Sequence, residues 1–170
     1  LYESHVIHGQ PRKLPSWSSP YLRSEFDDQA IKEVLVRRHI SSRYEKNSAR
    51  KTAELLARGE VVAAFQGRME FGDRALGNRS ILADPRNPEV KDKINSAIKY
   101  RESYRPFAPV VLEDKAQVYF DVPEGFKSHY MEKVRPIRKE FHEKLPAVTH
   151  VDGSGRLQTV TKDTNPWLFE

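Results

Sequence analysis

The chain has 170 residues, a net charge of +5, no cysteine and a hydrophobic content of 38%. This length is enough for one domain with a packed core, and the lack of cysteine excludes disulfides and thiolate chemistry. Because no apolar run could span a bilayer and no signal peptide stands at the start, we expect a cytoplasmic location without a membrane partner. The basic excess favours anionic ligands, but the two signs are interspersed and nucleic acid is not required.

The first 48 residues are predicted to form an extension with one helix. Residues 1–21 are rich in Ser and Pro and lack periodicity, which indicates a linker or a wrapped extension. The chain begins with Leu rather than Met, which we interpret as a piece cut from a longer protein. Asp27 and Asp28 can cap a helix over residues 29–39, whose apolar face is formed by Ile31, Val34 and Leu35.

The segment after it indicates two helices and two strands. Ser48 can cap a helix over residues 49–58, which Gly59 ends, with Ala53, Leu55 and Leu56 buried. Residues 61–66 are almost continuously apolar, as is typical of a central strand, and residues 80–83 form a second strand. Asn87-Pro88 opens a third helix that ends near residue 99, with a buried stripe of Val90, Ile94, Ala97 and Ile98.

The remaining pattern predicts short strands and connections. We expect strands over residues 109–112 and 129–134, the second ended by Pro136, and a short helix over residues 113–119. Two β-rich runs, 147–151 and 156–160, flank Asp152-Gly153-Ser154-Gly155 and indicate a hairpin. Strands and helices are mixed without strict alternation, so the predicted class is α/β, with α+β open, around a mixed sheet.

Arginine and glycine concentrate in residues 67–109. A surface helix needs neither in such number, whereas a guanidinium group suits bidentate contact with phosphate or carboxylate. Glycine lets the backbone approach a ligand closely. We interpret this stretch as an anion site, most simply for phosphate. Its basic side chains are Arg68, Arg74, Arg79, Arg86, Lys99, Arg101 and Arg105.

The turn between Arg74 and Arg79 has two interpretations. Both guanidinium groups and several backbone amides could converge on one anion, with the Ser80 hydroxyl as a further donor. Alternatively, the arginines pair on the surface with acidic neighbours. The spacing leaves both open. Those neighbours are Glu70, Asp73 and Asp84.

The cations after the third helix also have a structural explanation, because positive charge is stabilised at a helix C-terminus. It suits Arg101, which has Glu102 beside it, whereas Lys99 and Arg105 are better ligand candidates because prolines stiffen the chain beyond them. His150 is more simply a packed or capping residue, and Asp152 a turn former. The histidines are scattered, so no metal site is assigned. With no nucleophile in evidence, catalytic residues stay unassigned, and positioning and charge stabilisation are the expected mechanism.

Three blocks carry a resemblance: EFGDRALGNRSILADPR, IKYRESYRPFAPVV and AVTHVDGSGRLQTV. In order and spacing they resemble the C-terminal part of carbamoyltransferases related to nodulation and antibiotic-tailoring proteins, over about residues 53–168. The resemblance implies a YrdC-like twisted sheet with flanking helices and a concave basic face, occupying residues 49–170 after an extension over 1–48. It implies binding of carbamoyl phosphate and of ATP as co-substrate, and formation of carbamoyl-adenylate.

The resemblance also implies a partner domain. In the similar proteins a separate N-terminal domain, related to the sugar-kinase and actin-like superfamily, holds iron and transfers the carbamoyl group to a hydroxyl. We expect that domain to be missing here, and the C-terminal domain to be incomplete after its Trp-Leu-Phe segment. This chain alone is therefore not expected to complete transfer, and its acceptor cannot be read.

Site residues follow from the same blocks. Lys99 and Arg156 are the first candidates for the phosphates of carbamoyl phosphate and nucleotide, and Glu70 and His150 are expected to orient others. The family usually has Pro where this chain has Asp73, which adds negative charge beside the site, and Thr where it has Ser154. The second group of phosphate candidates is Arg74, Arg79, Ser80 and Arg105.

A binding module is the alternative function. The same concave basic sheet could hold RNA, with Tyr100 and Tyr104 stacking on bases, and packing is an equally good explanation for both residues. RNA binding would weaken steeply with salt and tolerate many sequences, whereas a carbamoyl phosphate site would stay selective for the small ligand.

Overall fold

The computed structural model describes His8 and residues 19–170, so the linker predicted over residues 1–21 lies almost entirely outside the described part. Helices and short strands alternate irregularly, which confirms the predicted α/β class with mixed sheets. The elements are α1 (Asp28–Arg37), α2 (Ser48–Ala57), β1 (Val62–Phe65), β2 (Arg79–Leu82), α3 (Val90–Ala97), β3 (Val110–Leu112), η2 (Glu113–Lys115), α4 (Ala116–Tyr119), β4 (Lys133–Pro136), η3 (Lys139–Phe141), β5 (Ser154–Val160) and α5 (Pro166–Phe169).

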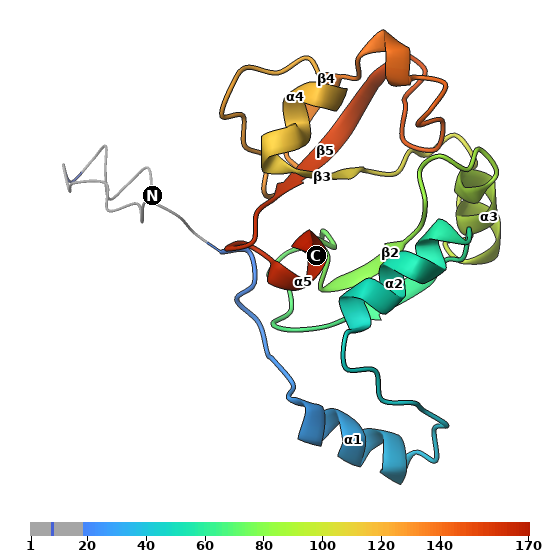
Figure 1. The fold of residues 1–170 in the computed structure, drawn as a ribbon, viewed down its shortest axis with the longest axis vertical. Coiled ribbons are helices and arrows are strands. Elements are labelled where there is room, and N and C mark those ends of the chain that lie inside the picture. The colour runs from blue at the N-terminus through green and yellow to red at the C-terminus, as the bar shows by residue number, and fades with distance from the viewer. Residues whose placement is uncertain (1–7, 9–18) are drawn as a thin grey trace.

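Two small sheets form the framework (Figure 1). Strands β1 and β2 pair antiparallel, with Val62 opposite Leu82. The second sheet has the order β3-β5-β4, in which β5 runs parallel to β3 and antiparallel to β4. The last strand of the described chain is therefore the central one of this sheet, and it carries Arg156, which pairs with Val134 of β4.

Helix α1 is stabilised at its N-terminus by a side-chain cap, and not by burial of its apolar face. The Asp27 side chain accepts a hydrogen bond of 2.8 Å from the backbone N–H of Ala30, as the sequence predicts. No residue of α1 is buried, and Ile31 and Val34 on its apolar face are 40% and 45% exposed. Figure 1 shows this helix set apart from both sheets.

The second helix forms as predicted, with a different cap and a smaller buried face. Asn47, not Ser48, accepts the capping hydrogen bond from the N–H of Arg50, because the helix already begins at Ser48 and residue 47 is the N-cap. The Ser48 hydroxyl accepts from the indole of Trp167. Ala49 is the buried position of α2, whereas Ala53 is exposed and Leu55 and Leu56 are only half-buried. Gly59 has a φ of 83°, as expected after the helix.

Two predictions about neighbouring elements are only partly confirmed: the pairing of the first strand and the buried face of the third helix. β1 is not central, since within the described residues it pairs with β2 alone. Val90 and Ile94 of α3 are buried as predicted, but Ala97 and Ile98 are exposed because the helix ends there. Asn95 takes the inward position instead, with an exposed fraction of 0%.

The predicted hairpin near the C-terminus is wrong. Residues 147–151 form no strand, and the Val151 side chain is fully exposed. The chain turns through backbone hydrogen bonds from Gly153 N–H to the His150 carbonyl and from His150 N–H to the Ser154 carbonyl. The following strand pairs with distant β3 and β4 instead of its sequence neighbour.

The strand predicted over residues 129–134 starts later and includes Pro136. Pro136 is tolerated there because β4 is an edge strand and needs no partner on its outer side. Strand β3 and the short helix after it form as predicted. They cover the main core, which consists of Val111, Ala116, Phe120, Val122, Phe126, Ile137 and Leu157.

Candidate anion site

A cavity of about 260 Å³ lies between the two sheets and is lined by four cationic side chains. Arg74 comes from the turn before β2, Lys99 and Arg101 from the segment after α3, and Arg156 from the central strand β5. Ser80 of β2 also lines it. The structure thus brings together four of the side chains predicted as phosphate ligands: Lys99, Arg156, Arg74 and Ser80.

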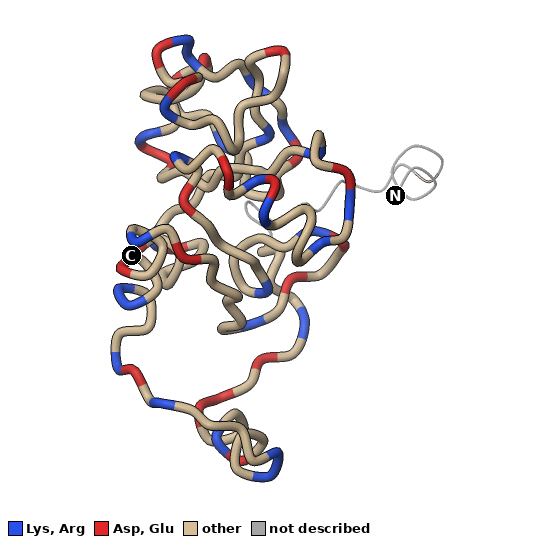
Figure 2. Tube along the Cα trace, turned by 90° about the vertical axis from the view of Figure 1, so that its right-hand side faces the viewer, with Lys and Arg blue, Asp and Glu red and all other residues tan. Residues whose placement is uncertain are grey.

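Three of these cations have no partner within the described part of the chain. The side chains of Arg74, Lys99 and Arg156 form no hydrogen bond and no ion pair there. Burial, and the neighbouring positive charges of Arg74 and Arg101, lower the pKa of Arg156. Elsewhere Lys and Arg are interspersed with Asp and Glu along the trace (Figure 2), whereas this cavity gathers four cations. Asp73 is the acidic residue of the lining.

The turn beside the cavity is built around a buried carboxylate. Glu70 has an exposed fraction of 0%, and its Oε1 accepts hydrogen bonds from the backbone N–H groups of Leu76 at 2.7 Å and Asn78 at 2.9 Å. Arg79 donates from its backbone N–H at 3.2 Å and from Nε to Oε2 at 3.0 Å. Burial alone would raise the pKa of Glu70, but these hydrogen bonds outweigh it and hold the pKa below its ordinary value.

This arrangement corrects the prediction that the turn offers its amides to a ligand. The N–H groups of Leu76, Asn78 and Arg79 are already taken by Glu70, and that of Gly77 donates to the Ser80 hydroxyl oxygen at 2.8 Å. Arg79 pairs with Glu70, as the alternative interpretation had it, and does not line the cavity. The Glu70 carboxylate thus holds the backbone of the turn, while the Ser80 hydroxyl keeps its proton for another acceptor.

Buried amide groups hold the turn against the C-terminal segment. Asn165 donates to the Asn78 side-chain oxygen at 2.7 Å and to the Tyr21 hydroxyl at 3.0 Å, and Tyr21 in turn donates to the Leu76 carbonyl. At Gly77, with a φ of 114°, an added Cβ would stand 2.5 Å from the Leu168 side chain. Sequence reasoning missed these contacts because Tyr21 and Asn165 lie in segments without periodicity.

Gln158 on β5 is a further cavity residue that the sequence did not reveal. It is 2% exposed, and its Nε2 donates to the Leu76 carbonyl at 2.9 Å. Its Oε1 is buried without a hydrogen-bond partner among the described residues. A strand position two residues after Arg156 shares its face, and this period-2 pattern is the signal that could have found it.

Other predicted residues lie outside the cavity. Arg105 pairs with Glu102 at 2.8 Å on the surface, where both side chains are more than half exposed. The His150 ring bonds the Ser154 hydroxyl through Nδ1 at 3.0 Å, and its buried Nε2 has no partner in the described structure. Across the described residues, His, Asp and Glu side chains nowhere gather in a group of three that could hold a metal.

Comparison with known proteins decides the family. Residues 53–170 match the family model described as the carbamoyltransferase C-terminus. The chain belongs to the carbamoyltransferase family. It is 50% identical over 133 residues to nodulation protein NolO of Bradyrhizobium diazoefficiens, which covers 78% of this chain and 24% of the relative. It is 47% identical over 146 residues to nodulation protein NolNO of Sinorhizobium fredii, with 84% and 22% covered.

A third relative carries an activity in its name. The chain is 49% identical over 114 residues to the 3'-hydroxymethylcephem-O-carbamoyltransferase of Streptomyces clavuligerus, over 66% of this chain and 21% of the relative. The chain thus spans about a quarter or less of the length of these three relatives. In the described part of this carbamoyltransferase domain, no helix is long and apolar enough to cross a membrane.

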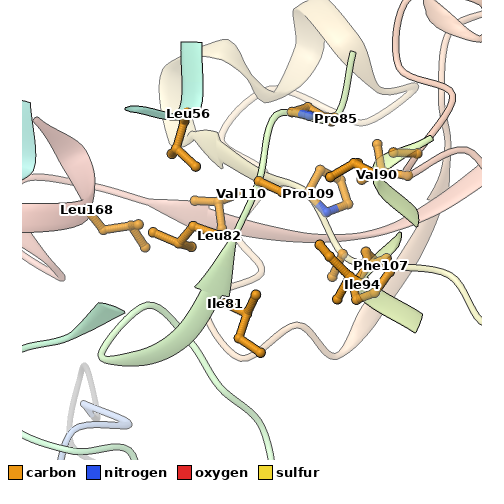
Figure 3. A pocket seen from close by; sticks show the side chains of 14 residues that line it. Leu56, Ile81, Leu82, Pro85, Val90, Ile94, Phe107, Pro109, Val110 and Leu168 are labelled. Carbon is orange, nitrogen blue, oxygen red and sulfur yellow. The ribbon is translucent and has the colours of Figure 1, made fainter. Parts of the chain in front are cut away.

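A second cavity of the carbamoyltransferase domain, about 290 Å³, has the opposite character. Figure 3 shows Leu56 from α2, Ile81 and Leu82 from β2, and Val110 from β3 pointing into it. Among the described residues, no ionisable side chain lines this second cavity, so they offer no charge to an anion there. Residues shared by both cavities form the wall between them: Ile81, Leu82, Phe107, Ala108 and Val110.

Proposed function

We propose that this chain is the part of an ATP-dependent O-carbamoyltransferase that binds carbamoyl phosphate and ATP and forms carbamoyl-adenylate. The observation that carries the proposal is the convergence of Arg74, Lys99, Arg101 and Arg156 on one cavity, in a chain of this family. Arg101 and Arg156 are half-buried, whereas Arg74 and Lys99 are exposed. Like charges brought together and partly desolvated are unfavourable on their own, so a cavity that collects them is suited to a ligand of opposite charge.

The chemistry fits a site made of cations. The reaction consumes one water: hydrolysis of carbamoyl phosphate releases phosphate and leaves carbamate, and a carbamate oxygen then displaces pyrophosphate from the α-phosphorus of ATP. Negative charge grows on leaving oxygens, where guanidinium and ammonium groups stabilise it through charge-assisted hydrogen bonds. Ser80 can donate a further hydrogen bond from its hydroxyl. No nucleophile of the protein is needed, so positioning and charge supply the catalysis.

The size of the cavity favours a small anion as its main occupant. Drug-sized ligands occupy about 300–1,000 Å³, and about 260 Å³ lies just below this range. We therefore place carbamoyl phosphate, or the phosphate-bearing end of ATP, against Arg156 and Lys99. Asp73 at the rim adds repulsion that the usual proline of the family would not.

The acceptor step is assigned to the N-terminal domain that the resemblance implies, with iron held there. This chain contributes activation, and its partners are carbamoyl phosphate, ATP and that domain, in the cytoplasm. The hydroxyl acceptor follows from the name of the Streptomyces clavuligerus relative, which transfers to a hydroxymethyl compound.

The test is exchange of labelled pyrophosphate into ATP by the longer protein. We expect exchange that depends on carbamoyl phosphate, and no transfer to a hydroxyl acceptor by the purified 170-residue chain. Exchange without any dependence on carbamoyl phosphate would refute the proposed reaction. Transfer by the 170-residue chain would refute the division of labour between the domains.

The RNA alternative gains no support from the relatives. Tyr100 and Tyr104 are exposed, as stacking would require, but neither lines the cavity. A salt titration separates the two functions. RNA affinity would fall with a steep logarithmic slope, since each phosphate contact releases about one counterion, whereas a small dianion held by directed hydrogen bonds would keep its selectivity.

A further inference from the structure

Asn95 is a buried amide that reaches across the loop after α3. It lies beside Ile94 on the inward face of the helix, and a buried amide costs free energy unless its polar atoms are bonded. Its Nδ2 donates to the carbonyls of Ser103 at 3.3 Å and Arg105 at 3.0 Å. Its Oδ1 accepts from Nε of Arg101 at 2.7 Å. One side chain thus fixes both ends of the loop.

The loop itself has an unfavourable backbone that these contacts maintain. Tyr100 has a φ of 48°, a left-handed conformation that a residue with a bulky side chain adopts at a cost. Its side chain is 86% exposed, so its own packing does not impose this geometry. The next residue, Arg101, is held by its backbone N–H at 3.0 Å from the Asn95 carbonyl as well as by its side chain. Asn95 therefore turns the chain back toward the cavity.

The Arg101 guanidinium is fixed on two sides. Nε is occupied by Asn95, and Cζ lies 4.8 Å from the centroid of the Phe107 ring, within the range of a cation–π contact. A guanidinium has five N–H donors, so the four on its terminal nitrogens remain for other acceptors. Arg101 lines the cavity, close enough to Arg156 for their charges to interact. A planar fork held in this way is suited to bidentate contact with phosphate.

We propose that Asn95 is a positioning residue that holds Arg101 in the cavity as a phosphate ligand. The inference rests on the proposed function, since it assumes that the cavity binds phosphate, and it adds a ligand and the residue that orients it. A free arginine loses side-chain freedom when it binds, whereas one already fixed by Asn95 and Phe107 loses little, so affinity is gained through preorganisation.

The test is calorimetric titration of the 170-residue chain with inorganic phosphate, well below its thermal midpoint. We expect Arg101→Ala to weaken the Kd about tenfold, the loss of one charge-assisted contact. Asn95→Ala should weaken it by a similar or smaller factor. The double variant should bind no more weakly than Arg101→Ala alone, because Asn95 acts through Arg101. Arg86→Ala is the matched control, since Arg86 pairs with Asp84 outside the cavity.

A merely structural role for Asn95 predicts other results. It would lower the thermal midpoint but leave the Kd of the folded variant unchanged, and that result would overturn the proposal, as would additive losses in the double variant. If Asn95→Ala does not fold, Arg101→Lys gives the answer. Lysine keeps the charge but has no Nε–H donor for Asn95 and no fork, so about tenfold weaker binding is expected, and wild-type affinity would overturn the proposal.

Arg156→Ala separates this inference from the proposed function. If Arg156→Ala weakens phosphate binding while Arg101→Ala does not, the inference about Asn95 and Arg101 is wrong and the anion cavity stands. If the wild-type chain does not bind phosphate, or if neither variant changes its Kd, both proposals are overturned.

Discussion

The turn around Glu70 and the cavity lined by Arg74, Lys99, Arg101 and Arg156 are neighbours, and both contain arginine. The arginines differ in whether a carboxylate of the chain pairs with them. In the turn, Arg79 and three backbone amides surround a carboxylate that belongs to the chain. In the cavity, Arg74 and Arg156 approach each other with no carboxylate bonded to either among the described residues. The charges of the turn are therefore balanced within the chain, and those of Arg74 and Arg156 are not balanced by a direct ion pair among the described residues.

This difference indicates separate roles for the arginines of the turn and those of the cavity. A paired and buried arginine stabilises the fold, and removing its partner leaves uncompensated groups behind. An unpaired cation near others of its sign makes no such contribution to the stability of the fold, and under the proposed function it would act by binding an anion. Substitutions in the turn should therefore act on stability, and substitutions in the cavity on binding.

The largest effect is expected from Glu70→Ala. Truncation leaves the N–H groups of Leu76 and Asn78 buried without an acceptor and Arg79 without its partner. The free energy of unfolding should fall by about 3 kcal/mol or more, measured by urea denaturation. Glu124→Ala, which removes an exposed carboxylate, is the control and should change it by less than about 0.5 kcal/mol. An unchanged urea midpoint for Glu70→Ala would contradict the assigned role.

Lowering the pH should also reduce the free energy of unfolding through Glu70, but by less than Glu70→Ala does. Hydrogen bonds hold the pKa of Glu70 below its ordinary value, so its contribution to stability is complete above the unfolded pKa of about 4.3. The contribution is lost as the pH falls through the lower, folded-state pKa. Glu70→Gln should flatten this part of the stability curve, measured by thermal unfolding between about pH 6 and pH 2. A variant curve parallel to that of the wild type would show that other carboxyls are responsible.

In the cavity, Lys99→Ala and Arg156→Ala should each weaken binding of carbamoyl phosphate by about 1.5–3 kcal/mol, or one to two decades in Kd. Neither side chain has a partner to lose in the described fold, so the thermal midpoint should stay close to that of the wild type. Arg156→Lys should also fail, since a point charge cannot replace a bidentate fork. If the alanine variants unfold instead, these cations are structural and the anion binds elsewhere.

The smallest effect is expected from Asp73→Asn, which removes the acidic residue of the cavity lining and so leaves only cations as its charged side chains among the described residues. Asp73 is exposed, so solvent and salt screen its repulsion of an anion, and the gain should be below about 1 kcal/mol. We expect affinity for carbamoyl phosphate to rise a few-fold at low ionic strength and the difference to disappear at about 1 M salt. Weaker binding by the variant would instead show that Asp73 contacts the ligand favourably.

The sequence predicted what local chemistry decides. The Asp27 cap, the left-handed Gly59 and the apolar stripe of Val90 and Ile94 all follow from neighbours a few residues away. The gathering of Lys99 and Arg156 in one cavity was predicted from motif order, since nothing local connects positions so far apart.

The predictions that were wrong concern contacts between residues far apart in the sequence. Residues 147–151 and 156–160 have the composition of a hairpin, but β5 pairs with β3 and β4, whose edges the sequence does not reveal. Similarly, sequence spacing does not predict that Arg79 forms an ion pair with Glu70 or that Arg101 lines the cavity. The sequence favours a structural role for Arg101 because Glu102 is beside it, yet Glu102 pairs with Arg105 and Arg101 lines the cavity.

The central position of β5 also sets an order of events during synthesis. Because a ribosome releases the chain from its N-terminus, β3 and β4 emerge before the strand that joins them, and neither can pair until residues 154–160 appear. Arg156 is delivered with that strand. The segment that carries Arg74, Lys99 and Arg101 is therefore synthesised before the strand that carries Arg156, and the four cations can line one cavity only after residues 154–160 have emerged.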